Sequence, residues 1–245
     1  MDDRWLKKLE YLNSNAINIS SNDSRCNGFF KILSNKFDGL ELRFVGSDQD
    51  VLIPALFGEF NAYNVAMSVL IARKIGISWH EILIGLKSFS GVPGRLQRHT
   101  LQNGVVAFVD FAHNPSSMKN VLSMLSLQTN DLITVFGCGG DRDREKRGIM
   151  GKIAYEKSDQ IIITDDNPRD EDRFKILNEI YNGIKSKNKD RKVKIIPDRY
   201  KAIAHASAIS KKGSIIALLG KGHEKYYLVK EKKHFFDDFE EISKF

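Results

Sequence analysis

Four polar clusters hold the residues of this chain that could do chemistry. They read DFAHNP at 110–115, GCGGDRDREKR at 137–147, DDNPRD at 165–170 and GKGHE at 220–224. Arginine can hold a carboxylate or phosphate through paired hydrogen bonds, carboxylate and amide oxygens can accept from an ammonium group, and glycine lets a ligand approach the backbone. Any one cluster could be a plain surface turn, but together they predict a site for small charged molecules.

The third cluster suits a zwitterion. Arg169 can take a carboxylate, while Asp166 and the Asn167 amide can take an ammonium group. Pro168 fixes the turn that carries them. In the fourth cluster, Glu224 can bind a second ammonium group. The two clusters together predict the binding of an amino acid with opposed charges.

The first two clusters favour anions. Asp110 can accept hydrogen bonds from ribose hydroxyls, and His113 and Asn114 open a predicted helix whose N-terminal amides attract phosphate. In the second cluster, four cationic side chains can hold carboxylate or phosphate: Arg142, Arg144, Lys146 and Arg147. The alternative for these four is a set of solvated ion pairs, which contribute little. No G-x-x-x-x-G-K-[ST] phosphate loop occurs in these 245 residues.

The predicted elements that position these clusters are strands and helices that alternate regularly from residue 104 onward. The predicted strands are 105–111, 132–137, 160–164, 193–197 and 214–220, and the predicted helices between them are 114–127, 145–158, 171–186 and 199–210. Apolar strands alternating with helices indicate a parallel sheet covered on both faces. We therefore predict a doubly wound, Rossmann-like α/β domain at 92–245, ending in a hairpin at 225–238. Ligands of such sheets bind beyond the carboxyl ends of the strands, where all four clusters fall.

Residues 1–91 have a different pattern and are predicted to form a separate unit. Two apolar runs, 39–46 and 50–58, indicate antiparallel strands, and 59–76 has apolar residues at helical spacing. A second helix is predicted at 78–89, with Ser78 as its N-cap and Glu81 completing a capping box.

Composition excludes several classes of protein. No apolar run approaches the roughly 18 residues that span a bilayer, and the first residues lack the apolar core of a signal peptide. Two cysteines cannot build a disulfide framework or a zinc site alone, so a cytoplasmic location is expected. The net charge is +7, but the basic runs are interleaved with acids and few aromatics, which does not favour nucleic-acid binding. No G-x-G-x-x-G follows the first strand of the α/β domain, which disfavours a dehydrogenase.

Taken in order, GRLQ, VDFAHNP, FGCGGDRDREKRGIMG, TDDNPR and LLGKGHE resemble the motifs of the Mur ligase family. DNPR resembles the signature of the members that add meso-diaminopimelate. The resemblance implies ATP-dependent addition of meso-diaminopimelate to UDP-MurNAc-L-Ala-D-Glu in peptidoglycan synthesis, through an acyl phosphate and with Mg²⁺ on the phosphates. It covers all of 92–245, and FGEFNAYNVAMSVLIARKIG resembles the end of the family's central ATP-binding domain.

By the same resemblance, two sets of residues bind ligands, and no catalytic residue is assigned. The diaminopimelate set is Arg142, Asp166, Asn167, Pro168, Arg169, Gly220 and Glu224. The ATP set is Asn64, Arg95, Asp110, His113 and Asn114.

The chain also departs from the family pattern. The family's N-terminal nucleotide-binding domain, its Gly-Lys-Thr/Ser phosphate loop and its carbamylated lysine have no counterpart here, so 1–91 resembles a remnant of the central domain. We expect that remnant to expose apolar surface, and we expect this chain alone not to catalyse ligation at a useful rate. A separate upstream chain could supply the missing half.

Two rival interpretations remain. One is an ATP-dependent ligase of the folylpolyglutamate type, which shares AHNP; DNPR together with GKGHE argues against it. The other is a non-catalytic module that binds an amino acid or a partner.

Overall fold

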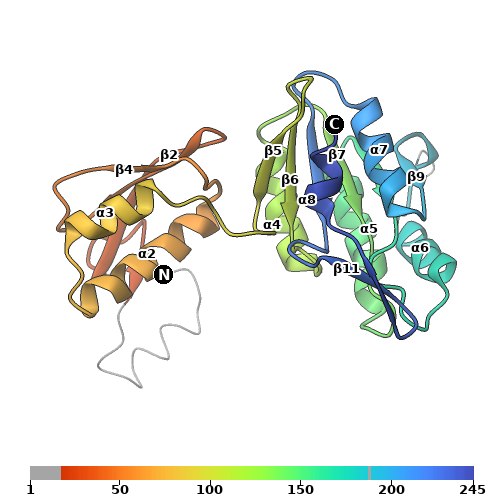
Figure 1. Ribbon diagram of the computed structural model, residues 1–245, viewed down its shortest axis with the longest axis horizontal. Coiled ribbons are helices and arrows are strands. Elements are labelled where there is room, and N and C mark those ends of the chain that lie inside the picture. The colour runs from red at the N-terminus through yellow and green to blue at the C-terminus, as the bar shows by residue number, and fades with distance from the viewer. Residues whose placement is uncertain (1–17, 187–188) are drawn as a thin grey trace. The chain divides into compact units, whose positions relative to one another are not determined.

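The computed structural model describes residues 18–186 and 189–245, which belong to two compact units, Met1–Gly91 and Val92–Phe245 (Figure 1). No helix among the described residues is long and apolar enough to cross a membrane.

The Met1–Gly91 unit contains a four-stranded sheet in the order β1-β2-β3-β4. Its elements are β1 (Ile19–Ser20), β2 (Gly28–Lys36), β3 (Gly39–Phe44), β4 (Val51–Ile53), α2 (Glu59–Lys74) and α3 (Trp79–Lys87). The predicted antiparallel pair is confirmed as β3 and β4, whereas β2 was not predicted. Strands and helices share a buried core that includes Phe30, Leu42 and Val65.

The helices of this unit begin where the sequence indicates. The Ser78 side chain accepts from the Glu81 amide at the start of α3, and the Glu81 carboxylate accepts from the Ser78 amide in return, so the predicted capping box is confirmed. The outer face of α2 leaves Met67, Ile71 and Ile75 exposed. Apolar surface is therefore present on this unit, beside a core that is well buried.

The Val92–Phe245 unit is built on a six-stranded sheet in the order β5-β6-β10-β7-β8-β9. The strands are β5 (Gln97–Thr100), β6 (Val106–Asp110), β7 (Leu132–Phe136), β8 (Gln160–Ile163), β9 (Val193–Ile195) and β10 (Ile215–Leu219). Every neighbouring pair is parallel except β5–β6, so the predicted parallel sheet is confirmed. The short edge strand β5 was not predicted, because its polar QRHT sequence gives no apolar signal.

Helices cover both faces of this sheet, as a doubly wound fold requires (Figure 1). They are α4 (Pro115–Leu125), α5 (Glu145–Lys157), α6 (Arg173–Asn182), α7 (Arg199–Ile209) and α8 (Asp238–Ile242). The chain moves in one direction across the sheet from β6 to β9, and α4, α5 and α6 pack side by side. From β9 the chain crosses back over the sheet to β10, opposite to its direction from β6 to β9. Because such crossovers are right-handed, α7 lies on the other face of the sheet, where it contacts α8.

Strand β10 therefore inserts between β6 and β7, where the order of the strands reverses. A hairpin of β11 (Tyr226–Val229) and β12 (Lys232–Phe235) lies between β10 and α8, as predicted for 225–238. A 3₁₀ turn, η1 (Lys189–Arg191), precedes β9. Strands β7 and β10 are buried at every position, which explains their continuous apolar sequences.

Candidate functional site

All four polar clusters lie at one edge of the larger sheet. Each directly follows a parallel strand: β6 ends at Asp110, β7 at Phe136, β8 at Ile163 and β10 at Leu219. Parallel strands present their carboxyl ends together, and this edge is where open α/β sheets bind ligands. The predicted convergence of the four clusters is confirmed.

The third and fourth clusters are joined by direct side-chain contacts. The Asn167 Nδ2 group donates to Glu224 Oε2 at 2.9 Å, although the two residues are 57 positions apart. The Nζ of Lys221 lies 3.5 Å from Asp166 Oδ1 and 3.5 Å from Glu224 Oε2. Asp166 and Asn167 are both buried. The predicted acceptors for an ammonium group are therefore grouped within one small region.

Arg169 is held over this region by the hairpin. Its backbone has a φ of 53°, which is rare for a side chain larger than glycine. Its amide donates to the Leu228 carbonyl at 3.0 Å, and its own carbonyl accepts from the Lys230 amide at 2.8 Å. Its Nη1 donates to the Gly140 carbonyl at 2.8 Å. Among the residues that the structure describes, Nε and Nη2 have no partner and remain able to bind a carboxylate.

The loop after β7 packs against the loop after β8. A Cβ atom on Gly140 would lie 2.0 Å from the Pro168 carbonyl oxygen, and the Gly140 amide donates to the Asn167 carbonyl at 2.8 Å. The glycines of this cluster were interpreted as room for a ligand. At Gly140 that interpretation is wrong, because the space is needed by the neighbouring loop.

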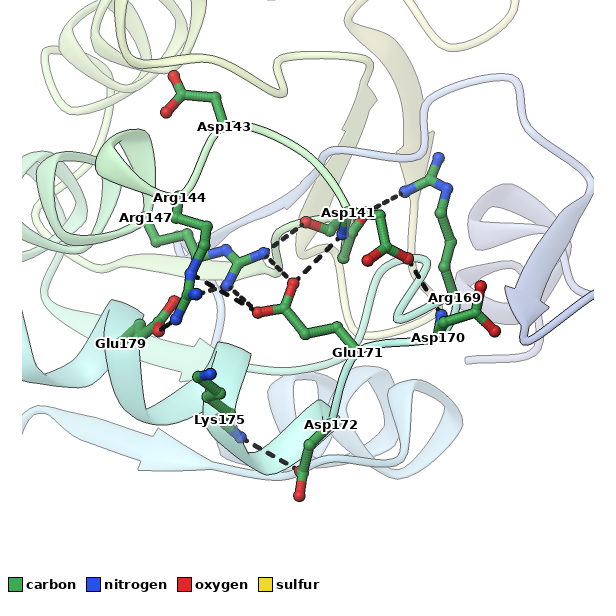
Figure 2. A network of polar contacts seen from close by, with 12 residues as sticks. Asp141, Asp143, Arg144, Arg147, Arg169, Asp170, Glu171, Asp172, Lys175 and Glu179 are labelled. Atoms are coloured by element: carbon green, nitrogen blue, oxygen red, sulfur yellow. Dashed lines mark hydrogen bonds and ion pairs between the residues drawn. The ribbon is translucent and has the colours of Figure 1, made fainter.

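Two arginines of the second cluster pair with carboxylates of the protein itself, Arg147 in the interior and Arg144 at the surface (Figure 2). Arg147 is 0% exposed and donates to both carboxylate oxygens of Glu171, at 2.8 and 2.7 Å, and to Glu179 at 2.6 Å. Arg144 pairs with Glu179. The prediction that Arg147 holds a ligand anion is therefore wrong, and the exposed Arg144 forms a surface ion pair, as the alternative interpretation expected. Arg142 is exposed and has no partner among the described residues, so it stays a candidate.

The Arg147–Glu171 pair makes an acid-dependent contribution to stability. Hydrogen bonding to Arg147 lowers the pKa of Glu171 to about 2. Between its ordinary pKa near 4.5 and about 2, Glu171 binds a proton only in the unfolded chain, so its stabilising effect is lost as the pH falls through that window.

Glu171→Gln is expected to lower the urea midpoint of unfolding at pH 7, and the difference from the wild type should shrink as the pH falls from about 5 to about 2. Chemical unfolding followed by circular dichroism at several pH values measures this. Glu156→Gln changes an exposed residue whose ion-pair partner among the described residues is Lys152, so it serves as the control and should show no such trend. A difference between Glu171→Gln and wild type that stays constant with pH would contradict the role of this pair.

The first cluster combines structural and exposed groups. Asp110 is buried, and its two carboxylate oxygens accept from the Leu96 and Ala112 amides, each at 2.8 Å. Burial raises the pKa of Asp110. Asn114 caps α4 by accepting from the Ser117 amide at 2.9 Å. Asp110 thus fixes the turn at Leu96, and its contact with ATP stays a prediction.

Phe111 was missed by the sequence interpretation. The Arg95 guanidinium lies 5.2 Å from the centre of its ring, and the rings of His113 and His223 lie 4.5 and 5.1 Å from it. The position of Phe111 between two predicted ATP residues was the available signal. Asn64, the remaining predicted ATP residue, lies on α2 in the other unit.

A cleft of about 640 Å³ adjoins the third cluster. Asp166, Pro168 and Arg169 line it, together with the start of α7 and the hairpin residues Tyr227 and Val229. The other predicted diaminopimelate residues, Arg142, Asn167, Gly220 and Glu224, do not line this cleft.

Metal and thiol chemistry find no support in this part of the chain. No group of three or more His, Cys, Asp or Glu side chains in 18–186 and 189–245 could hold a metal ion. None of the described residues is assigned as a Mg²⁺ ligand. Burial, with a smaller effect of Asp166, raises the pKa of the Cys138 thiol to about 12, so this cysteine is not poised as a nucleophile.

Comparison with known proteins agrees with these features. The family model for the Mur ligase, glutamate ligase domain matches residues 94–222. The UDP-N-acetylmuramoyl-L-alanyl-D-glutamate–2,6-diaminopimelate ligase of Prochlorococcus marinus subsp. pastoris is 37% identical over 97% of this chain and 49% of its own length.

Solved structures give the same result. A structure of UDP-N-acetylmuramoyl-L-alanyl-D-glutamate–2,6-diaminopimelate ligase has a TM-score of 0.65 at 28% identity, covering 99% of this chain and 51% of the other. Folylpolyglutamate synthase from Thermotoga maritima has a TM-score of 0.58 at 21% identity over 77% and 43% of the two chains, which shows a shared fold alone. The chain spans about half the length of the curated relative that it matches.

Proposed function

Because the chain belongs to the Mur ligase family, we propose that it carries the amino-acid-binding part of an ATP-dependent ligase that adds meso-diaminopimelate to UDP-MurNAc-L-Ala-D-Glu in peptidoglycan synthesis. In this proposal Val92–Phe245 binds the amino acid, and Met1–Gly91 is part of the central ATP-binding domain. The remaining parts of the enzyme, including the phosphate loop, lie outside this sequence.

The observation that carries the proposal is the Asn167–Glu224 hydrogen bond of 2.9 Å. It brings the DNPR turn and the GKGHE loop together, so that Asp166 and Glu224 present carboxylates beside the guanidinium-bearing turn of Arg169. Diaminopimelate has two amino-acid centres. Arg169 would hold the carboxylate of one centre, and Glu224 and Asp166 would hold its ammonium group.

This grip on one centre explains how the other centre reacts. The distal amino group stays free to attack the acyl phosphate that ATP generates on the dipeptide carboxylate. Amide formation releases phosphate, and the chain's contribution is to orient the nucleophile and restrict its motion. Lysine has no carboxylate at the end of its side chain, so it leaves the Arg169 fork unpaired.

ATP would bind along the first cluster. The N-terminal end of α4 and the Ser116 amide would attract phosphate, and Arg95, His113 and His223 lie around the ring of Phe111 with groups that suit a nucleotide.

Isothermal titration of the 245-residue chain tests this proposal. We expect meso-diaminopimelate to bind, and L-lysine to bind about tenfold to a hundredfold more weakly, because a charge-assisted hydrogen bond to the missing carboxylate contributes roughly 1.5–3 kcal/mol. A chain denatured in urea provides the control for non-specific heat. Equal affinity for the two amino acids, or no binding of either, would refute the proposal.

A further inference from the structure

We propose that Lys221 is a positioning residue that sets the selectivity of the amino-acid site for a centre carrying both an ammonium and a carboxylate group. The inference rests on the proposed function, since it concerns the same site. The side chain of Lys221 is buried, with 0% of it exposed, so its ammonium group does not reach a ligand at the surface. Its effect must pass through the residues that it contacts.

The contacts of Lys221 join every predicted ammonium acceptor. Its Nζ lies 3.3 Å from Asn167 Oδ1, 3.5 Å from Asp166 Oδ1 and 3.5 Å from Glu224 Oε2. An ammonium group has three protons and no acceptor, so it can serve all three oxygens together. Gly220, with a φ of 111°, makes the turn that directs the chain inward at this point. Lys221 thus lies beneath the site and faces three of its residues.

The first consequence concerns the orientation of the Asn167 amide. Its Oδ1 accepts from both the Leu228 amide, at 2.9 Å, and Lys221. An amide whose oxygen is held by two donors must direct its Nδ2 the other way, and here Nδ2 donates to Glu224 Oε2. Lys221 therefore helps to fix which carboxylate oxygen of Glu224 is occupied, and leaves Oε1 for a ligand.

The second consequence concerns charge. Asp166 and Glu224 are two carboxylates held in one partly buried region, and Lys221 compensates one of them. The remaining negative charge matches a single ammonium group, while Arg169 supplies the positive charge for a carboxylate. The set is then neutral and complementary to a zwitterionic centre. Without Lys221 the set would be net negative, and it would favour a lone ammonium group such as that of lysine.

A purely structural role predicts something different. If Lys221 only supported the fold, its loss would weaken the binding of meso-diaminopimelate and L-lysine by the same factor. The ratio of the two affinities is therefore the diagnostic measurement.

Lys221→Met is expected to reduce the affinity ratio of meso-diaminopimelate to L-lysine at least tenfold in calorimetric titrations of the whole chain. Lys225→Met is the matched control, because Lys225 belongs to the same loop, is 65% exposed and pairs with Asp237 outside the site. It should leave the ratio unchanged. A ratio that is also unchanged in Lys221→Met would overturn the inference while the proposed function stands.

A second measurement does not depend on ligand binding or on the stability of the variant. In the wild-type chain labelled with ¹⁵N, the Asn167 side-chain amide protons should exchange slowly, and the Lys221 ammonium protons should show a scalar or nuclear Overhauser contact to this amide. The two measurements fail separately. If the wild type bound neither amino acid, the proposed function would fail. Fast exchange of the Lys221 ammonium protons would overturn the positioning role.

Discussion

Replacing Arg199 by methionine is expected to lower the free energy of unfolding of the Val92–Phe245 unit by about 3–5 kcal/mol. Arg199 and Asp238 form a buried ion pair in which Nε and Nη2 donate to the two carboxylate oxygens at 2.8 and 2.7 Å. Burial alone lowers the pKa of Arg199, but Asp238 and the nearby carboxylates outweigh it and raise the pKa. The methionine variant would leave Asp238 buried without its partner.

Arg199 also supports the two loops of the amino-acid site. Its Nη1 donates to the Asp165 carbonyl and its Nη2 to the Leu219 carbonyl, both at 3.1 Å. These carbonyls immediately precede Asp166 and Gly220, so one side chain links the carboxyl ends of β8 and β10 beneath the site. The variant should therefore lose affinity for meso-diaminopimelate even under conditions in which it remains folded.

Urea unfolding followed by circular dichroism measures the effect on stability. Arg173→Met is the control, because Arg173 pairs with Asp165 at 43% side-chain exposure and should contribute no more than about 1 kcal/mol. If the two variants lost equal stability, the buried pair would not be a main support of the domain.

The parts of the fold that the sequence predicted are those with strong local signals. The central strands β7 and β10 are buried at every position, which gives their sequences a continuous apolar signal. The capping box at the start of α3 was predictable because its two residues, Ser78 and Glu81, are only three positions apart. Strand β5 and helix α8 were not predicted from the sequence. Strand β5 is a polar edge strand, and α8 is a single short turn held by tertiary contacts.

The candidate site divides in the same way. The convergence of the four clusters followed from strand direction alone, which a sequence pattern reveals. The sequence did not predict that Arg142 is exposed whereas Arg147 is buried. Both are arginines of one segment, and only the fold decides which of them is exposed. Lys221 was likewise not singled out from the sequence, since nothing local indicates that its side chain is buried.

Arg169→Lys is expected to reduce the affinity for meso-diaminopimelate by roughly 30-fold or more, while the weak binding of L-lysine stays unchanged. Truncating one partner of a desolvated charge pair typically costs about 2–5 kcal/mol. Lysine keeps the positive charge but loses the planar fork, so it cannot form two parallel hydrogen bonds to a carboxylate while another nitrogen of the same group donates to the Gly140 carbonyl. The backbone φ of 53° is equally unfavourable for both side chains, so the comparison isolates the guanidinium.

Titration calorimetry with the two amino acids measures this selectivity, and Arg191→Lys provides the control. Arg191 is exposed and precedes β9, at the opposite edge of the sheet from the four clusters, so its replacement should change neither affinity. A loss of L-lysine binding in Arg169→Lys equal to the loss of meso-diaminopimelate binding would mean that Arg169 shapes the turn and does not read a carboxylate. Selective loss of meso-diaminopimelate would place the discriminating contact on the guanidinium, because the side-chain carboxylate is the only charged group that distinguishes the two ligands.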